Sequence, residues 1–443
     1  LGWPIMLTHF FQIAYNLVDT YWLGRLGVEE VAAPTLVWPM VFLLVSIAGG
    51  LAVAGVALVS QYAGAKNESE IKRSAGQVMS LLVIVGTVIS VLSILLGDLV
   101  LQLMGPEPEV FQLASPYIKL IFASMPFMFI IMVYSFILRG WGDTRTPMYI
   151  SGLSVGLNIV LDPFLILGVD GFFPGLGVTG AGIATLIARS IGGALCLYLL
   201  FHGKRTLRIS FSDLRIEKEK AKQVFRIGIP SSIGQGMVAL GFVVMVALVV
   251  KMGTQVIATY GIGTRVINII FTLTGGLTGA AVTMIGQNLG AGNKKRAGRV
   301  LYRTMGVSML ILLACSAAFY TFSDQIYGAF LQDKQVIEEG SRFFLIFGFS
   351  LCLFGVYSSS LSAFQAAGHT VPAMILGIAR LWLMRVPISL ALAFLLNFGV
   401  VGIWMGMGLS NLTSAIAALA WVSLGKWKEG IIEIPAGAEV GEV

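Results

Sequence analysis

Polar side chains interrupt an otherwise apolar N-terminal stretch, residues 2–27. The stretch is long enough to cross a bilayer, which takes about 20 residues in helical form. Four polar residues in it follow steps of four, three and four positions, and therefore share one helix face: Thr8, Gln12, Tyr15 and Asp19. A carboxylate at the centre of a spanning helix costs about 3 kcal/mol. We therefore expect this face to look into protein or a watery cavity, where such an acid usually handles ions, protons or cationic ligands.

A second acid, Asp162, lies in the apolar stretch 146–168. Asn158 precedes it by one helical turn, so an amide and a carboxylate share a face. Pro163 follows directly and cannot donate a hydrogen bond to the carbonyl of Ile159. That oxygen is therefore free to accept from water or to bind an ion.

The two acids are expected at a matched depth. Counting about 1.5 Å per residue, Asp19 and Asp162 lie roughly 8–9 Å below the outer ends of their helices. Thr179, near the start of the following span, can reach a similar depth. Together with Asn158 these groups form an oxygen-rich cluster, which suits a proton or a hard cation such as Na⁺. The alternative is an acid pair that only bonds helices together, but acids within membranes rarely have that role alone.

The composition is that of a polytopic helical membrane protein. Of the 443 residues, 57% are hydrophobic and 12% are charged, whereas soluble domains average about 25% charged residues. The net charge of +7 suits cytoplasmic loops that meet anionic lipid, and not a nucleic-acid partner. The three cysteines lie far apart, without a disulfide or metal spacing. We find no ATP-binding, zinc or nucleophile motif, and we expect neither enzymatic activity nor a cofactor.

Hydrophobic runs separated by polar, glycine or proline breaks predict twelve membrane spans and an all-α fold. The first six spans are 2–26, 30–62, 73–103, 110–138, 146–168 and 177–202, and the second six are 222–250, 256–288, 298–322, 336–366, 372–396 and 400–424. We divide the chain into an N-lobe (1–202), a linker (203–221), a C-lobe (222–425) and a tail (426–443). Because the chain begins at Leu1 inside a hydrophobic run, we expect further residues upstream.

The two halves are an internal repeat, since matching residues recur 226 positions apart. The matching pairs include Gly2 and Gly228, Pro4 and Pro230, Gln61 and Gln287, Asn67 and Asn293, and Gly142 and Gly368. Each unit has six spans, so both run in the same direction through the membrane. This arrangement predicts a pseudo-twofold axis along the membrane normal, with substrate bound between the halves.

The distribution of lysine and arginine predicts the orientation. Basic residues concentrate in the linker 203–221 and in the other loops on the same side, and they are sparse on the opposite side. The positive-inside rule then places both termini in the cytoplasm and the turn 169–176 outside. We expect a multi-pass protein of the plasma membrane.

The chain resembles the multidrug and toxic compound extrusion (MATE) family, in its prokaryotic and archaeal form, over essentially its whole length. The resemblance rests on NLVDTYWLGRLG around Asp19, on the pair QYAGAKN and QNLGAGN, on LRGWGDTRTP, and on LNIVLDP around Asp162. It implies a V-shaped protein of two six-helix lobes that exports organic cations and other drugs in exchange for H⁺ or Na⁺.

The resemblance also implies site residues. Its N-lobe cation site falls on Asp19, Asn158, Asp162 and Thr179, as a proton-coupling or Na⁺ site. Gln12 and Tyr15 line the same cavity, and we add their neighbours Asn16 and Thr20 to the predicted substrate cavity. In some relatives the second lobe carries coupling acids, but here the helices that would carry them, the spans 222–250 and 336–366, show none in mid-span, so a second ion site there is not expected.

We therefore predict a cation-coupled multidrug antiporter, with small-molecule drugs and membrane lipid as its partners and a monomer as its working state. One alternative is a flippase for lipids or lipid-linked oligosaccharides on a related two-lobe scaffold, which would need a strongly cationic cleft. Three arginines of the second half keep this alternative open: Arg265, Arg380 and Arg385. These three arginines can line a cavity or neutralise the acids, or equally extend to the membrane surface or make structural bonds. Arg189 also falls within a span, and the sequence assigns it no role. A membrane enzyme is a further alternative, but the chain shows no catalytic set of residues.

Overall fold

The computed structural model describes residues 1–169, 173–203, 206–331 and 333–432. Its first six helices are α1 (Gly2–Leu23), α2 (Val28–Gly64), α3 (Glu68–Met104), α4 (Pro108–Trp141), α5 (Arg145–Leu167) and α6 (Gly177–His202). Between α5 and α6 lie two short antiparallel strands, β1 (Gly168–Val169) and β2 (Phe173–Pro174). Residues 170–172 of the turn predicted to face outside lie beyond the described part of the chain.

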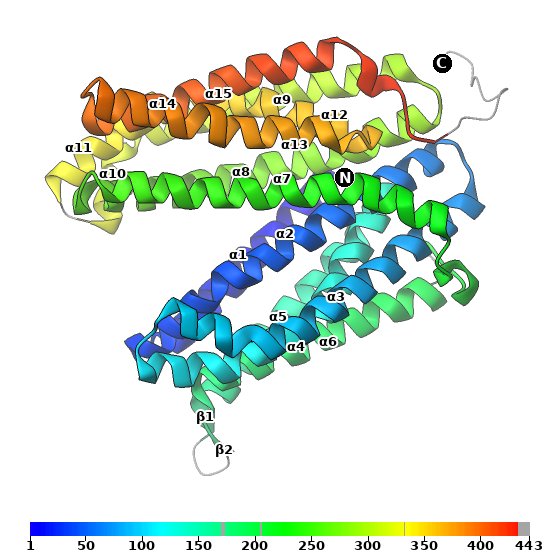
Figure 1. Cartoon of the computed structure of the whole chain (residues 1–443), viewed down its shortest axis with the longest axis horizontal. Coiled ribbons are helices and arrows are strands. Elements are labelled where there is room, and N and C mark those ends of the chain that lie inside the picture. Colours follow the sequence, from blue (N-terminus) through cyan, green and yellow to red (C-terminus); the bar gives the residue numbers. More distant parts are fainter. Residues whose placement is uncertain (170–172, 204–205, 332, 433–443) are drawn as a thin grey trace. The chain divides into compact units, whose positions relative to one another are not determined.

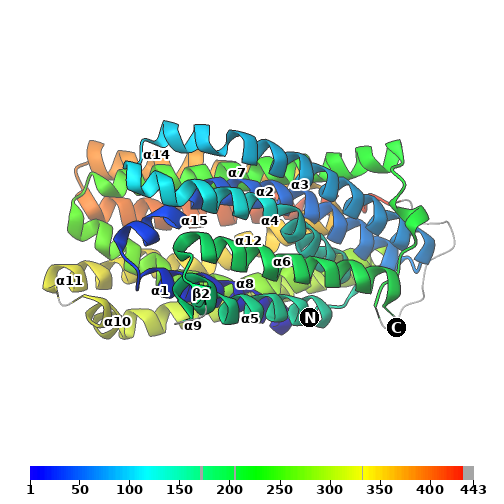
Figure 2. The same cartoon turned by 90° about the horizontal axis from the view of Figure 1, so that it is seen from below.

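The second half is again helical (Figures 1 and 2). Its helices are α7 (Lys218–Val250), α8 (Thr254–Gly290), α9 (Lys294–Thr321), α10 (Ser323–Phe330), α11 (Lys334–Phe343), α12 (Phe349–Ala367), α13 (Thr370–Ile378), α14 (Val386–Leu390) and α15 (Gly399–Ser423). Three segments are π-helical: Phe344–Gly348 joins α11 to α12, Ala379–Arg385 joins α13 to α14, and Ala391–Leu395 extends α14. A fold of this kind confirms the predicted all-α class.

All twelve predicted spans are helical. Among the described residues, eleven helical runs are long and apolar enough to cross a membrane, including the joined runs Lys334–Ala367 and Thr370–Leu395. The twelfth, α1, is less apolar because of its polar face, but its 22 residues extend roughly 33 Å. The sequence did not predict the π-helical turns. One of them lies just before Pro387, which cannot continue the normal hydrogen-bond ladder.

The repeat is visible in how equivalent helices begin and end. The side chain of Asn67 accepts a hydrogen bond from the Glu70 amide at the start of α3, and Asn293 accepts one from the Arg296 amide at the start of α9. Gly142 and Gly368 end α4 and α12 with positive φ angles of 109° and 79°. Glycine adopts this left-handed conformation without the steric cost of a Cβ atom. Each half therefore uses the same cap residues at positions separated by 226.

The chain divides into two compact units. The first consists mainly of Trp3–Val59 and Asn67–Ile229, and the second contains Ser60–Lys66 and the described residues from Pro230 onward. In the first unit α4 packs against α3 and α6, and α5 packs against α6. In the second, α12 packs against α8, α9 and α15. Each unit has its own apolar core.

The described part of the linker belongs to the first unit. A short 3₁₀ helix, Phe211–Leu214, lies against α3, where the Ser80 hydroxyl donates to the carbonyl of Leu214 at 2.8 Å. The Gln77 side chain donates to the carbonyl of Arg215 and accepts from the amide of Glu217. These polar contacts hold the described part of the linker against α3 in the first unit. Residues 204–205 of the linker and 433–443 of the tail lie outside the described residues.

Candidate functional site

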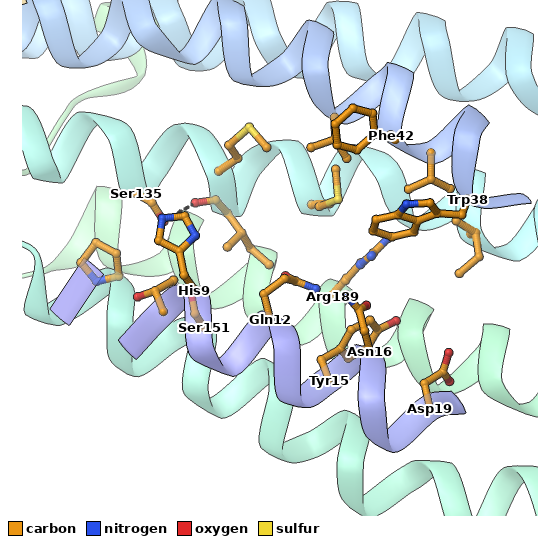
Figure 3. Close-up of a pocket in the computed structure, with 18 of the residues that line it drawn as sticks. His9, Gln12, Tyr15, Asn16, Asp19, Trp38, Phe42, Ser135, Ser151 and Arg189 are labelled. Carbon is orange, nitrogen blue, oxygen red and sulfur yellow. Dashed lines mark hydrogen bonds between the residues drawn. The ribbon is translucent and has the colours of Figure 1, made fainter. Parts of the chain in front are cut away.

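A cavity of about 660 Å³ lies inside the first unit, lined by α1, α2, α4, α5 and α6 (Figure 3). The face of α1 that looks into it carries Thr8, Gln12, Tyr15, Asn16, Asp19 and Thr20, which are the polar residues predicted from the sequence. His9 and Asp19 lie toward opposite ends of this row in Figure 3. The polar face of α1 that the helical period predicted therefore lines a cavity.

The wall opposite α1 is mostly apolar. α2 contributes two large aromatic side chains, Trp38 and Phe42, and α4 contributes Met128 and Met132. Aromatic faces attract organic cations, and methionine side chains adapt to ligands of different shape. This wall suits amphipathic ligands with both an apolar body and a charged group.

Asp19 joins the cavity to a second, deeper cluster. This residue is only 8% exposed, and its Oδ1 is buried without a hydrogen-bond partner in the described part of the chain. Asp162 is completely buried and near enough for its charge to interact with that of Asp19. Two negative charges in a poorly solvated place repel each other, and a proton or a cation relieves that repulsion.

Asn158 and Asp162 complete this cluster from α5. The Asn158 Nδ2 group donates to Asp162 Oδ1 at 3.0 Å, and neither side chain is among those lining the cavity. Asn158 Oδ1 and Asp162 Oδ2 are buried and have no partner among the described atoms. Asp19 Oδ1 is a third buried oxygen of this kind, and oxygen is the ligand atom that Na⁺ or a shared proton prefers. We call Asp19, Asn158 and Asp162 the acid cluster.

The hydroxyl that α6 presents to α1 comes from Thr185. The Tyr15 and Thr185 hydroxyls are hydrogen-bonded at 2.7 Å, and Thr185 is 1% exposed. Thr179 is half-buried and is not among the lining residues, so its place in an ion site stays a prediction. A sequence signal for Thr185 exists, because it lies on the face of α6 that carries small buried residues: Ala181, Ala184 and Ala188.

Three basic residues of the cavity were not assigned to the site from the sequence: His9, Arg139 and Arg189. Arg189 donates from Nη1 to the Ser124 hydroxyl at 2.9 Å, and its charge is close enough to interact with Asp19. The Arg139 guanidinium lies 4.8 Å from the ring of Phe136. An arginine within the apolar span 177–202 is itself a signal for a functional site. The cavity thus offers charges of both signs.

Comparison with known proteins agrees with this geometry. The MatE family model matches residues 4–164 and 230–391, one match in each half. The probable multidrug resistance protein YoeA of Bacillus subtilis is 30% identical over 409 residues, which cover 91% of this chain and 88% of that protein. The FAD transporter of Shewanella oneidensis is 27% identical, with coverage of 91% and 89%.

Solved structures share the whole fold. A crystal structure of MATE in the straight conformation matches with a TM-score of 0.90 at 25% identity, over 97% of this chain and 96% of that one. A transporter of the MOP superfamily from Pyrococcus furiosus, described as having a binding pocket of reverse polarity, matches with a TM-score of 0.89 at 26% identity, over 96% and 94%. The two matched repeats and the all-helical fold lead to one assignment. The chain is a membrane transporter, not an enzyme, and it belongs to the MATE family of multidrug efflux transporters.

Proposed function

We propose that this protein exports organic cations and other drugs in exchange for H⁺ or Na⁺. The observation that carries the proposal is the double position of Asp19, which lines the cavity and also belongs to the acid cluster. A single carboxylate can neutralise either a bound coupling ion or a cationic substrate. The coupling ion and the substrate therefore compete for the charge of Asp19. If the bound ion weakens substrate binding, the bound substrate weakens ion binding by the same factor.

In this mechanism the cavity holds the drug while Asp19 is ionised. The aromatic side chains of Trp38 and Phe42 receive its apolar and cationic parts. Entry of a proton or Na⁺ at the acid cluster removes the negative charge that Asp19 offers to the drug. The Tyr15–Thr185 hydrogen bond holds α1 against α6, so a change at Asp19 one turn away can shift the packing of α1. The drug then leaves to the outside.

Efflux in proteoliposomes tests the proposal. The purified protein, loaded with a fluorescent organic cation, is expected to move the dye when an inward H⁺ or Na⁺ gradient is imposed, and not when the gradient is absent. Movement that is the same with and without either gradient would contradict ion coupling. The same vesicles with a fluorescent phospholipid test the flippase alternative.

Because the whole site lies in one unit of one chain, we propose a monomer as the working state.

A second candidate substrate class carries an anionic group, such as the phosphates of a flavin dinucleotide. It is favoured by the two arginines that line the cavity, Arg139 and Arg189, since arginine binds phosphate with paired hydrogen bonds. A relative named as an FAD transporter makes this class chemically reasonable for the fold.

The Arg189→Gln variant separates the two substrate classes. We expect transport of a flavin dinucleotide to fall by about tenfold or more, since a hydrogen bond to a charged group is lost, and transport of an organic cation to persist. The matched control is Arg265→Gln, which removes an exposed arginine of α8. Equal flavin transport by wild type and Arg189→Gln would contradict a role for Arg189 in anion recognition.

We propose that both termini face the cytoplasm, following the lysine and arginine distribution. In a variant whose three cysteines are replaced, a new cysteine at Val28 should react with an impermeant reagent applied outside intact cells. A cysteine at Ser210 should react only after the cells are opened. Val28 is 87% exposed and Ser210 is also exposed, so the structure itself does not block either site. The opposite labelling pattern would reverse the orientation.

A further inference from the structure

Two arginines are buried in the membrane-spanning part of the second unit. Arg380 is 6% exposed and Arg385 is 2% exposed. Both belong to the π-helical segment Ala379–Arg385. Hydrogen-bonded residues in a π-helix are five positions apart, so these two side chains leave the same face, one turn from each other. Neither arginine has a role in the mechanism proposed above.

Their direct partners are neutral. Asn411 Oδ1 accepts from Arg380 Nη2 at 3.2 Å and from Arg385 Nη2 at 2.9 Å. The Ser410 hydroxyl accepts from Arg385 Nε at 2.9 Å. The Asn411 amide group in turn donates to the Ser350 hydroxyl at 2.9 Å. One amide oxygen of α15 therefore serves two guanidinium groups, and no negative charge is present in this set.

Aromatic rings cover the remaining sides. The guanidinium carbon of Arg380 lies 4.5 Å and 4.9 Å from the ring centres of Phe354 and Tyr357. That of Arg385 lies 5.5 Å from the ring of Phe347. Such rings offer a partial negative face but no formal charge. They stabilise the arginines in place without cancelling their two positive charges.

Carboxylates are few in the helical part of this half. Between Pro230 and Ser423 it contains four acids, which lie on or beside α10 and α11: Asp324, Asp333, Glu338 and Glu339. Three of them have other partners. Asp324 accepts from Ser341 at 2.8 Å, Asp333 caps α11, and Glu339 pairs with Arg342 at 2.6 Å. Arginine stays protonated in proteins, so a double positive charge is buried at this point, and its hydrogen-bond partners among the described residues are all neutral.

We infer that the Arg380–Arg385 cluster binds a small monovalent anion of the halide class. Arg380 Nε provides an additional donor, because it is buried and has no hydrogen-bond partner among the described atoms. An anion beside the two guanidinium groups accepts from this Nε and from their remaining N–H groups. It supplies the charge that buried arginines require. We infer a small anion because the aromatic rings of Phe347, Phe354 and Tyr357 lie against the two guanidinium groups and leave little room beside them.

Halide-dependent stability tests the site. The full-length protein, in nanodiscs without halide, is titrated with sodium bromide or chloride against sodium gluconate at constant Na⁺ and ionic strength. We expect a saturable rise of the unfolding temperature in wild type. In Arg385→Gln the halide concentration at half saturation should increase by about tenfold or more, since bonds to a charge are lost. Arg265→Gln, on the exposed side of α8, should respond as wild type does, and Arg380→Lys should keep a response because it keeps the charge.

A wild-type protein that ignores halide, or an Arg385→Gln protein with an unchanged halide response, would overturn the assignment. If Arg385→Gln does not fold, anomalous diffraction from wild-type crystals grown in bromide decides the question. A bromide peak within hydrogen-bond distance of the Arg380 and Arg385 guanidinium groups supports the site. Bromide found only elsewhere, with none at these groups, contradicts it.

Discussion

Replacing Asp19 by asparagine is expected to reduce ion-driven drug export to the background leak, and Asp162→Asn should do the same. Asparagine keeps the size of the side chain but cannot carry the charge that a proton or Na⁺ must neutralise. Both variants should fold and insert normally. Asp19 Oδ1 and Asp162 Oδ2 have no hydrogen-bond partner among the described residues that the change would remove, and the loss of one buried charge relieves the repulsion between the two carboxylates. Dye efflux from proteoliposomes, compared at equal protein content, measures the effect.

Asp98→Asn is the matched control for these variants. Asp98 is an acid of α3 in the same unit, its side chain is 38% exposed, and it pairs with Lys119 at 2.6 Å, away from the cavity. Ion pairs with this exposure contribute little to stability, so export should remain near the wild-type level. Full export by both Asp19→Asn and Asp162→Asn at normal expression would show that coupling does not depend on the acid cluster.

Protons and Na⁺ should compete for the acid cluster. Carboxylates bind Na⁺ only when they are ionised, and therefore Na⁺ binding should weaken as the pH falls, by up to about tenfold per pH unit for one competing proton. Asp19→Asn should remove this pH dependence, because the variant has lost the carboxylate that the two ions share. Isothermal titration across roughly pH 5 to 8 measures both effects.

Three outcomes of that titration have distinct meanings. Weaker Na⁺ binding at low pH, lost in Asp19→Asn, supports the shared site. Absence of Na⁺ binding at every pH would leave a transporter coupled to protons alone. Na⁺ binding that persists unchanged by pH in Asp19→Asn would place the ion elsewhere and contradict the assignment of the acid cluster.

The sequence alone predicted where the twelve apolar helical spans lie, because the length and hydropathy of a span are set by the bilayer. It also determined which residues share a face on one helix. The steps from Thr8 to Asp19 identified the polar face of α1, and the one-turn spacing of Asn158 and Asp162 placed them on one face, where the structure shows them hydrogen-bonded. The internal repeat could also be recognised from the sequence, because helix caps such as Asn67 and Asn293 depend only on neighbouring residues of the chain.

Only the tertiary structure decided the orientation of each helix about its axis and its position along its neighbours. Counting residues from the helix end favoured Thr179, whereas packing of α6 on α1 brings Thr185 to Tyr15. The orientation of α6 in the structure also places Arg189 at the cavity. A π-helical turn aligns Arg380 with Arg385. Periodicity fixes directions within one helix, but contacts between helices depend on side-chain packing over the whole interface. That packing comes from residues distant in the sequence, which no local pattern specifies.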